Sequence, residues 1–143
     1  MIDSILLVDD EDLFHLVFED ACSLLDISLS LQCISSSDEA ASLFKKIREG
    51  RAEKPECVFV DLNIIGSSFD GIELIRKINF EYGDGVVIGI ISSSNDAIEQ
   101  AKAVKAGAQF WIIKSDNIEP RLEEFKKDYP GFRNRTASFR VYK

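Results

Sequence analysis

The sequence predicts an α/β fold of the (βα)5 type, in which helices cover both faces of a doubly wound, five-stranded parallel sheet. Five short strand-like runs alternate with five segments whose apolar residues repeat at helical spacing. The length of 143 residues suits one compact domain and is too short for two typical ones. Alternation of this kind is typical of parallel strands joined by right-handed crossovers.

The five expected strands are short and rich in apolar residues. The first is the run SILLV, the second alternates apolar and polar residues, and the third, ECVFVDL, is almost continuously apolar. Continuous apolar runs are typical of strands buried on both faces of a parallel sheet. In chain order, the expected strands cover residues 4–8, 29–35, 56–62, 85–95 and 109–114.

The five expected helices follow these strands in turn. The first has six apolar residues at helical spacing between Leu13 and Leu24. The second begins with Ser37 or Asp38 as a cap and ends at Gly50. The segment NIIGSSFDG, before the third helix, is expected to form a loop. In chain order, the expected helices cover residues 11–25, 36–50, 72–80, 96–108 and 118–129.

The C-terminal residues differ in composition from the rest of the chain. Residues 131–143 include four basic and three aromatic residues but no acidic residue. We therefore divide the chain into a domain over 1–129 and a basic, aromatic tail over 130–143. Two interpretations of the tail stay open. It is either a terminus that is loosely ordered or packs locally, or an arm that binds a partner or nucleic acid.

The composition argues against several classes of protein. A net charge of -8 and a pI near 4.7 disfavour nucleic-acid binding by the main body, because phosphate contacts need a basic face. The three cysteines are far apart and form no CxxC pair, so buried free thiols in a reducing compartment are expected. The run ILLV is too short for a signal peptide or a membrane span. We therefore expect a cytoplasmic location and no membrane partner.

Polar residues stand where four of the expected strands end. Asp9 and Asp10 end the first strand, Asp61 the third, Ser92 the fourth and Lys114 the fifth. In an open parallel sheet, the functional crevice lies at the carboxyl ends of the strands. We therefore expect three carboxylates, a hydroxyl and an ammonium to converge there.

These residue types suit phosphoryl transfer to an aspartate. Closely spaced carboxylates repel one another, so they take up protons or recruit a hard cation such as Mg2+. Asp61 can then attack phosphorus and form an acyl phosphate. Mg2+ and Lys114 would offset the charge that develops on the transferred group, and Ser92 could donate a hydrogen bond to it.

The chain resembles the receiver domain of response regulators, the CheY-like, flavodoxin-like phosphoacceptor module of two-component phosphorelay signalling. The resemblance covers residues 3 to about 128. It rests on the (βα)5 order, the acidic pair after the first strand and the Asp, Ser and Lys that end the third, fourth and fifth strands. These signals are weak one by one and strong together.

The resemblance implies a role for each residue of this set. Asp61 is implied to be the phosphorylated residue. Ser92 is implied to move toward the phosphoryl group, and Lys114 to pair with it. The ligands implied for Mg2+ are Asp9, Asp10, Asp61 and the backbone carbonyl of Asn63.

Two departures from the family pattern follow Asp61 and Lys114. The loop LNIIGSSFDG lacks the usual Pro and is longer by about two residues, which affects access to Asp61. Ser115 replaces the Pro whose cis bond usually follows the Lys. A cis bond before a residue other than Pro costs about 2.5–4 kcal/mol. We predict a trans Lys114–Ser115 bond or, if cis, a strained one, with a shift of Lys114 that weakens phosphorylation.

Three residues near the acidic pair are expected to have structural roles and not to belong to the site. Glu11 and Asp12 are interpreted as acids at a helix start, where the helix dipole stabilises negative charge. His15 is the only histidine. It is expected to face solvent, because the apolar stripe of its helix lies at other positions.

Ser92 and Trp111 also have alternative interpretations. Ser93 or Ser94 could replace Ser92 if the register differs, because serine is common in turns. The resemblance places Trp111 at the family's switch aromatic, whose inward or outward rotamer reports the state of the hydroxyl residue. Packing at the sheet edge explains Trp111 about equally well, since its neighbours Phe110 and Ile112 are the residues expected to be buried.

The sequence thus favours a signalling receiver and not an enzyme. Asp61 would be phosphorylated by a sensor histidine kinase or phosphotransfer protein, and the modification would switch contacts with a downstream protein target. The resemblance also implies a homodimer surface on the fifth strand and last helix. The alternative is a phosphorylation-independent adaptor, or pseudo-receiver. A phosphatase is disfavoured, because Asn63 stands where such an enzyme would carry a second acid.

Overall fold

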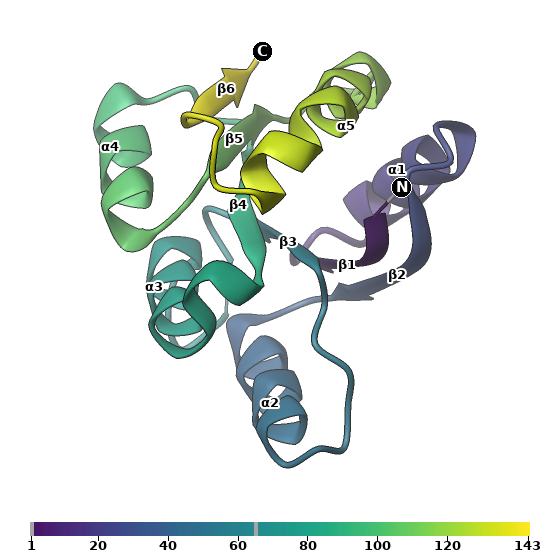
Figure 1. Cartoon of the computed structure of the whole chain (residues 1–143). Helices are drawn as coiled ribbons and strands as arrows, with labels where there is room; N and C mark the ends of the chain where they lie inside the picture. Colours follow the sequence, from purple (N-terminus) through teal and green to yellow (C-terminus); the bar gives the residue numbers. More distant parts are fainter. Residues whose placement is uncertain (1, 65) are drawn as a thin grey trace.

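The computed structural model describes residues 2–64 and 66–143, and its centre is a parallel sheet (Figure 1). Within this part of the chain the sheet has six strands in the order β2-β1-β3-β4-β5-β6. The predicted fold class is confirmed, but the predicted number of five strands is corrected to six. In chain order the strands are β1 (Ile2–Val8), β2 (Ser28–Ile34), β3 (Cys57–Asp61), β4 (Val87–Ser92), β5 (Phe110–Ile113) and β6 (Arg140–Tyr142).

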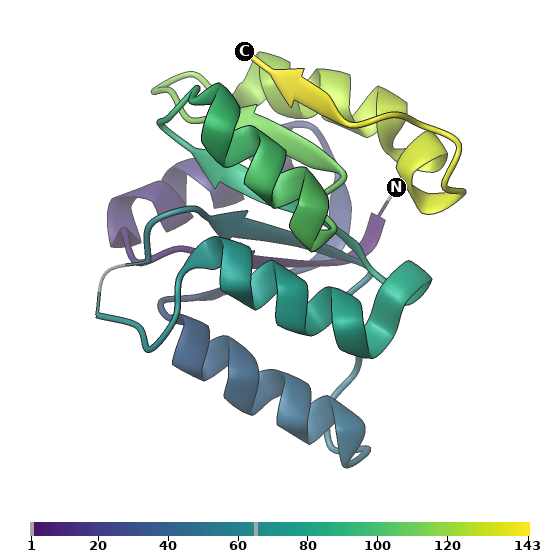
Figure 2. The same ribbon diagram turned by 90° about the vertical axis from the view of Figure 1, so that its left-hand side faces the viewer.

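Helices cover both faces of the sheet (Figure 2). The helices α2, α3 and α4 lie on one face, and α1 and α5 lie on the other. None of the described helices is both long and apolar enough to cross a membrane. The α-helices are α1 (Asp12–Leu24), α2 (Ser37–Arg48), α3 (Gly71–Tyr82), α4 (Ala97–Ala106) and α5 (Glu119–Arg133), and the 3-10 helix η1 (Gly83–Gly85) follows α3.

Alternate side chains of the strands fill two cores. In β1, Ile5 and Leu7 pack on the face of α1 and α5, whereas Leu6 and Val8 pack on the opposite face. The first core contains contacting aromatic rings whose centres lie 4.5–6.1 Å apart. Burial of these large rings supplies much of the hydrophobic stabilisation. The rings are those of Phe14, Phe18, Phe59, Phe110, Phe125, Tyr129, Phe132 and Tyr142.

The sheet order places the functional crevice between β1 and β3. The chain runs from β1 to β2 on one side and returns to β3 on the other side of β1. This reversal leaves a crevice at the carboxyl ends of the two strands. Residues that follow β1 and end β3 therefore face the same opening.

The largest difference from the predicted bounds is at α5. The helix continues past the predicted end at residue 129 to Arg133, although it contains Pro130. Tyr129 and Phe132 are buried in the core on either side of this proline. Packing of these two rings outweighs the local preference of proline to end a helix. The other predicted bounds lie within three residues of the observed ones.

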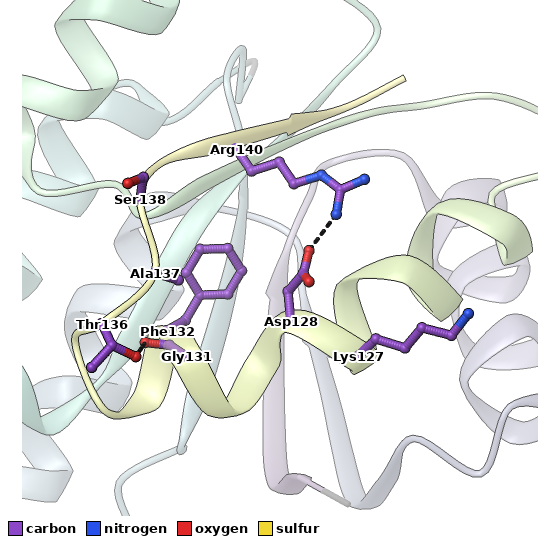
Figure 3. Close-up of a pocket in the computed structure, with 8 residues that line it drawn as sticks. All are labelled: Lys127, Asp128, Gly131, Phe132, Thr136, Ala137, Ser138 and Arg140. Carbon is purple, nitrogen blue, oxygen red and sulfur yellow. Dashed lines mark hydrogen bonds and ion pairs between the residues drawn. The ribbon is translucent and has the colours of Figure 1, made fainter.

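The end of the tail packs along β5 as the extra strand. Trp111 is paired with Val141 in the parallel ladder between β5 and β6. Figure 3 shows the junction with α5, where Arg140 reaches back to Asp128 at 2.5 Å. The Tyr142 hydroxyl donates a second hydrogen bond to Asp128, at 2.6 Å. The tail is thus tied to the body by its own basic and aromatic residues, while a separate function for 130–143 stays a prediction.

Candidate functional site

The predicted site residues lie at the carboxyl edge of the sheet. Asp9 follows β1, Asp61 ends β3, Ser92 ends β4 and Lys114 follows β5. A cavity of about 450 Å3 opens between these strand ends. The cavity is lined by Asp10, Glu11, Asp61, Asn63, Ser92, Ser93, Ser94 and Lys114.

Asp9 is the most deeply buried acid of the site. Its side chain is 0% exposed, and its Oδ1 accepts a hydrogen bond from the Glu11 N–H at 2.9 Å. Its Oδ2 lies 2.7 Å from the Lys114 Nζ. Among the described residues, this Oδ2 accepts no well-aligned hydrogen bond. Its negative charge is compensated by the neighbouring Lys114 ammonium. A buried carboxylate is stable only with such a partner.

His15 packs against the turn that follows β1. Its Nε2 lies 2.5 Å from the Asp9 carbonyl oxygen, and the residue is half-buried. The N–H on Nε2 therefore donates a hydrogen bond to this carbonyl. The prediction of a solvent-facing histidine is corrected, because the first turns of α1 bring the ring back over the end of β1.

Lys114 is shared among three carboxylates. Its Nζ lies 2.7 Å from Asp9 Oδ2, 2.9 Å from Glu11 Oε1 and 3.5 Å from Asp61 Oδ2. Burial acts to lower the pKa of Lys114, but the close contacts with the Asp9 and Glu11 carboxylates and the negative charge of Asp61 outweigh it, so the pKa is raised. The side chain therefore stays an ammonium at neutral pH.

Asp61 binds a proton more tightly than an ordinary aspartate. Burial and the negative charge of Asp9 raise the pKa of Asp61 to about 7, against the lowering effects of Lys114 and a hydrogen bond from the Asn63 backbone. Without a bound cation, Asp61 is therefore partly protonated at neutral pH. A cation beside it would favour the carboxylate form, which is the nucleophilic one.

Ser92 and Trp111 are connected through the loop after β4. Ser92 is buried, and its Oγ accepts a hydrogen bond from the Ser94 N–H at 3.1 Å. The Trp111 Nε1 donates to the Ser94 carbonyl oxygen at 2.9 Å. Trp111 is 0% exposed, as are Phe110 and Ile112. Trp111 therefore packs inward and not at a sheet edge, because β6 lies beyond β5.

Gly71, at the start of α3, allows the backbone to approach Asp61. A Cβ atom at this position would lie 2.1 Å from the Asp61 carbonyl oxygen. The Gly71 N–H donates to the Leu62 carbonyl oxygen at 3.2 Å, which closes the loop. This role of Gly71 was not predicted from the sequence. The only signal for it in the sequence was that a Gly follows an Asp at the end of the loop. Ile65 of the same loop lies outside the described residues.

The acids of the site suit a hard divalent cation. Carboxylate oxygens of Asp9, Glu11 and Asp61 lie within 4.8 Å of one another. Oxygen ligands at this density are those that Mg2+ prefers. Asp10 and Asn63, the other predicted ligands, line the same cavity. The donor set therefore fits Mg2+, with Glu11 as an additional candidate ligand.

Glu11 is not the simple helix-start acid that the sequence predicted. It occupies the N-cap position of α1, but its side chain accepts no capping hydrogen bond and pairs with Lys114 instead. No signal in the sequence linked these two residues, because Lys114 lies 103 positions further along the chain.

The peptide bond between Lys114 and Ser115 is trans, since the described residues contain no cis bond. This agrees with the prediction based on Ser115.

Comparison with known proteins supports a single family. The family model for the response regulator receiver domain matches residues 5–123. No curated protein matches the chain. A response regulator of red light signalling in R. palustris is 22% identical, with a TM-score of 0.74, and the match covers 96% of this chain and 97% of the other.

Two further solved structures have the same fold. The phosphorylated cyanobacterial phytochrome response regulator RcpA is 19% identical, has a TM-score of 0.72 and is matched over 96% of this chain and 98% of its own. A response regulator from Thermotoga maritima is 24% identical, has a TM-score of 0.71 and is matched over 89% of this chain and 97% of its own. The family match, together with this fold, shows that the chain belongs to the response regulator receiver domains.

Proposed function

We propose that this receiver is phosphorylated on Asp61 in a Mg2+-dependent transfer from a histidine kinase or phosphotransfer protein. Receiver domains are signalling modules of two-component systems and not classical enzymes. The observation that carries the proposal is the position of Asp61 at the end of β3, 3.5 Å from the Lys114 ammonium and beside Asp9. A carboxylate held next to a cation and a second acid is suited to accept a phosphoryl group.

The proposed step replaces a P–N bond by a P–O bond. A carboxylate oxygen of Asp61 attacks the phosphorus of a phosphohistidine, and the histidine nitrogen leaves with the bonding electrons and then takes up a proton. The product on this chain is an acyl phosphate. With a small donor such as acetyl phosphate, acetate is the leaving group and the product is the same.

The neighbouring residues would stabilise the transferred group. When bound, Mg2+ neutralises negative charge on the phosphoryl oxygens. Asp9, Asp10 and Asp61, with the Asn63 carbonyl, would hold the ion. The Lys114 ammonium would pair with a phosphoryl oxygen, and the Ser92 hydroxyl would donate a hydrogen bond to another.

The single tryptophan offers a direct test of this site. Trp111 is hydrogen-bonded to the loop that carries Ser92 to Ser94, so a rearrangement of that loop changes its surroundings. We expect Mg2+ followed by beryllium fluoride, a mimic of the phosphoryl group, to change Trp111 emission in the wild type. The same titration of Asp61→Asn should leave the emission unchanged.

A phosphorylation-independent adaptor is the second candidate. Two observations favour it, namely Ser115 in place of the usual Pro and a Lys114 ammonium that lies closer to Asp9 than to Asp61. Unchanged Trp111 emission in the wild type, at concentrations that saturate a known receiver, would favour this candidate.

The proposed switch acts on contacts with a downstream protein target. The homodimer implied by the fifth strand and last helix is also retained as a proposal. Because β6 covers the outer edge of β5, such a dimer would include β6 and α5 in its surface.

A cytoplasmic location is proposed as well, because all three cysteines are free. Burial is the main cause that raises the pKa of Cys22 and of Cys33 to about 12, so neither is a reactive thiolate.

A further inference from the structure

The Glu11 carboxylate is positioned to act on Lys114. Its Oε1 lies 2.9 Å from the Lys114 Nζ, and the side chain is 61% exposed. The side chains of Asp9 and Asp61 are only 0% and 8% exposed. An exposed carboxylate can exchange an ion pair for water at little cost, whereas a buried one cannot. Glu11 is therefore the carboxylate partner that Lys114 can lose most easily.

Two groups of the α1 segment draw Lys114 away from the proposed nucleophile. One is Glu11, and the other is the ring of Phe14, whose centre lies 4.5 Å from the Lys114 Nζ. An ammonium over an aromatic face is stabilised by the ring quadrupole. The distance to Asp61 Oδ2 is longer than that to Glu11, at 3.5 Å. The ammonium is thus held on the side of α1.

We propose that Glu11 is a positioning residue that holds Lys114 toward α1 in the unphosphorylated protein and releases it when a phosphoryl group reaches Asp61. This inference rests on the proposed phosphorylation of Asp61. A phosphoryl group carries a charge of about -1.5 to -2, which attracts the ammonium more strongly than one carboxylate does. It also repels Glu11. Glu11 therefore opposes phosphorylation and sets how readily Lys114 becomes available.

The test compares Glu11→Gln with Asp12→Asn at saturating Mg2+ and acetyl phosphate. Both substitutions remove one negative charge from exposed, adjacent positions, and Asp12 forms no ion pair among the described residues. The phosphorylation rate of Glu11→Gln should rise about two- to fivefold, as loss of one exposed ion pair allows. Asp12→Asn should stay near the wild-type rate. Equal rates for the two variants would overturn the proposal.

A second readout is independent of phosphorylation. Urea unfolding of Glu11→Gln should occur at a lower midpoint than in the wild type, because an ion pair to Lys114 is lost. In a Lys114→Met background, the same change should no longer lower the midpoint, because the ion pair is already absent and loss of the Glu11 charge only relieves repulsion among the three carboxylates. A shift of equal size in both backgrounds would overturn the pairing itself.

The two readouts also separate the two proposals. An adduct in the wild type, with equal rates in both variants, overturns the role of Glu11 and leaves the phosphorylation of Asp61 standing. Absence of any wild-type adduct, with the Glu11–Lys114 coupling intact, overturns phosphorylation and with it the release step.

Discussion

The indole nitrogen of Trp111 donates a hydrogen bond to the carbonyl oxygen of Ser94, with 2.9 Å between the two atoms. This bond joins a fully buried ring of β5 to the loop that follows β4. Movement of the loop therefore requires either loss of the bond or movement of the ring. Trp111 couples the rim of the site to the core beneath it.

Trp111→Phe tests this coupling through stability. The substitution removes the donor, leaves the Ser94 carbonyl without it and shrinks a fully buried ring. We expect the free energy of unfolding to fall by about 1–3 kcal/mol, as measured by urea denaturation. A fall below about 0.5 kcal/mol, the range of ordinary surface substitutions, would contradict the packing described here.

Gly71→Ala should be strongly destabilising. The new Cβ would lie 2.1 Å from the Asp61 carbonyl oxygen, and backbone cannot move aside as a flexible side chain can. Gly85→Ala is the matched control, because its Cβ would meet only the end of the Lys54 side chain, at 2.7 Å. We expect Gly71→Ala to lower the free energy of unfolding by about 2 kcal/mol or more and Gly85→Ala by less than about 1 kcal/mol. Similar losses in urea denaturation would refute the close-approach argument.

The raised pKa of Asp61 predicts how stability depends on pH without metal. The folded protein binds this proton up to about pH 7, whereas an unfolded aspartate releases it near 3.8. The contribution of Asp61 to the free energy of unfolding is therefore fully present at low pH, and it is lost as pH rises from about 4 to about 7. In Asp61→Asn no carboxyl group titrates at this position, so this loss of stability does not occur.

In the presence of a chelator, Asp61→Asn should be more stable than the wild type at pH 8, by on the order of 1–3 kcal/mol. The difference should decrease steadily toward pH 4. Urea denaturation across this range provides the measurement. A difference that does not vary with pH would mean that Asp61 titrates normally.

The junction between the tail and α5 depends on Asp128. Its Oδ2 accepts a hydrogen bond from Arg140 (Figure 3). The same oxygen accepts a second hydrogen bond from the Tyr142 hydroxyl. Asp128→Ala should lower the free energy of unfolding by about 1–2 kcal/mol and speed amide exchange in β5, where β6 is paired. Glu123→Ala, an exposed acid on the same helix, should have little effect. Equal exchange rates in β5 for the two variants would argue against the anchoring role of Asp128.

The order of the strands and helices was predictable because each element carries its own local pattern. Five βα units were visible from apolar runs and helical spacing alone. The sixth strand was not, because β6 has three residues and is held in place by β5 and Asp128. The inward packing of Trp111 depends on the same strand and was left open for the same reason.

The site was predictable as far as it follows from strand ends. Asp61, Ser92 and Lys114 end strands or follow them directly, so the topology of the sheet brings them together. Glu11 was interpreted as a helix-start acid because its sequence neighbours are acids, while its actual partner, Lys114, is distant in the chain. Contacts of this kind depend on tertiary structure and leave no periodic signal in the sequence.

The central claim is that Asp61 accepts a phosphoryl group. It is tested most directly by intact-mass spectrometry after incubation with Mg2+ and acetyl phosphate, with Asp61→Asn measured in parallel. We expect a single phosphoryl adduct in the wild type that is absent from Asp61→Asn and abolished by a chelator. No adduct in the wild type, under conditions that label a known receiver, would contradict it.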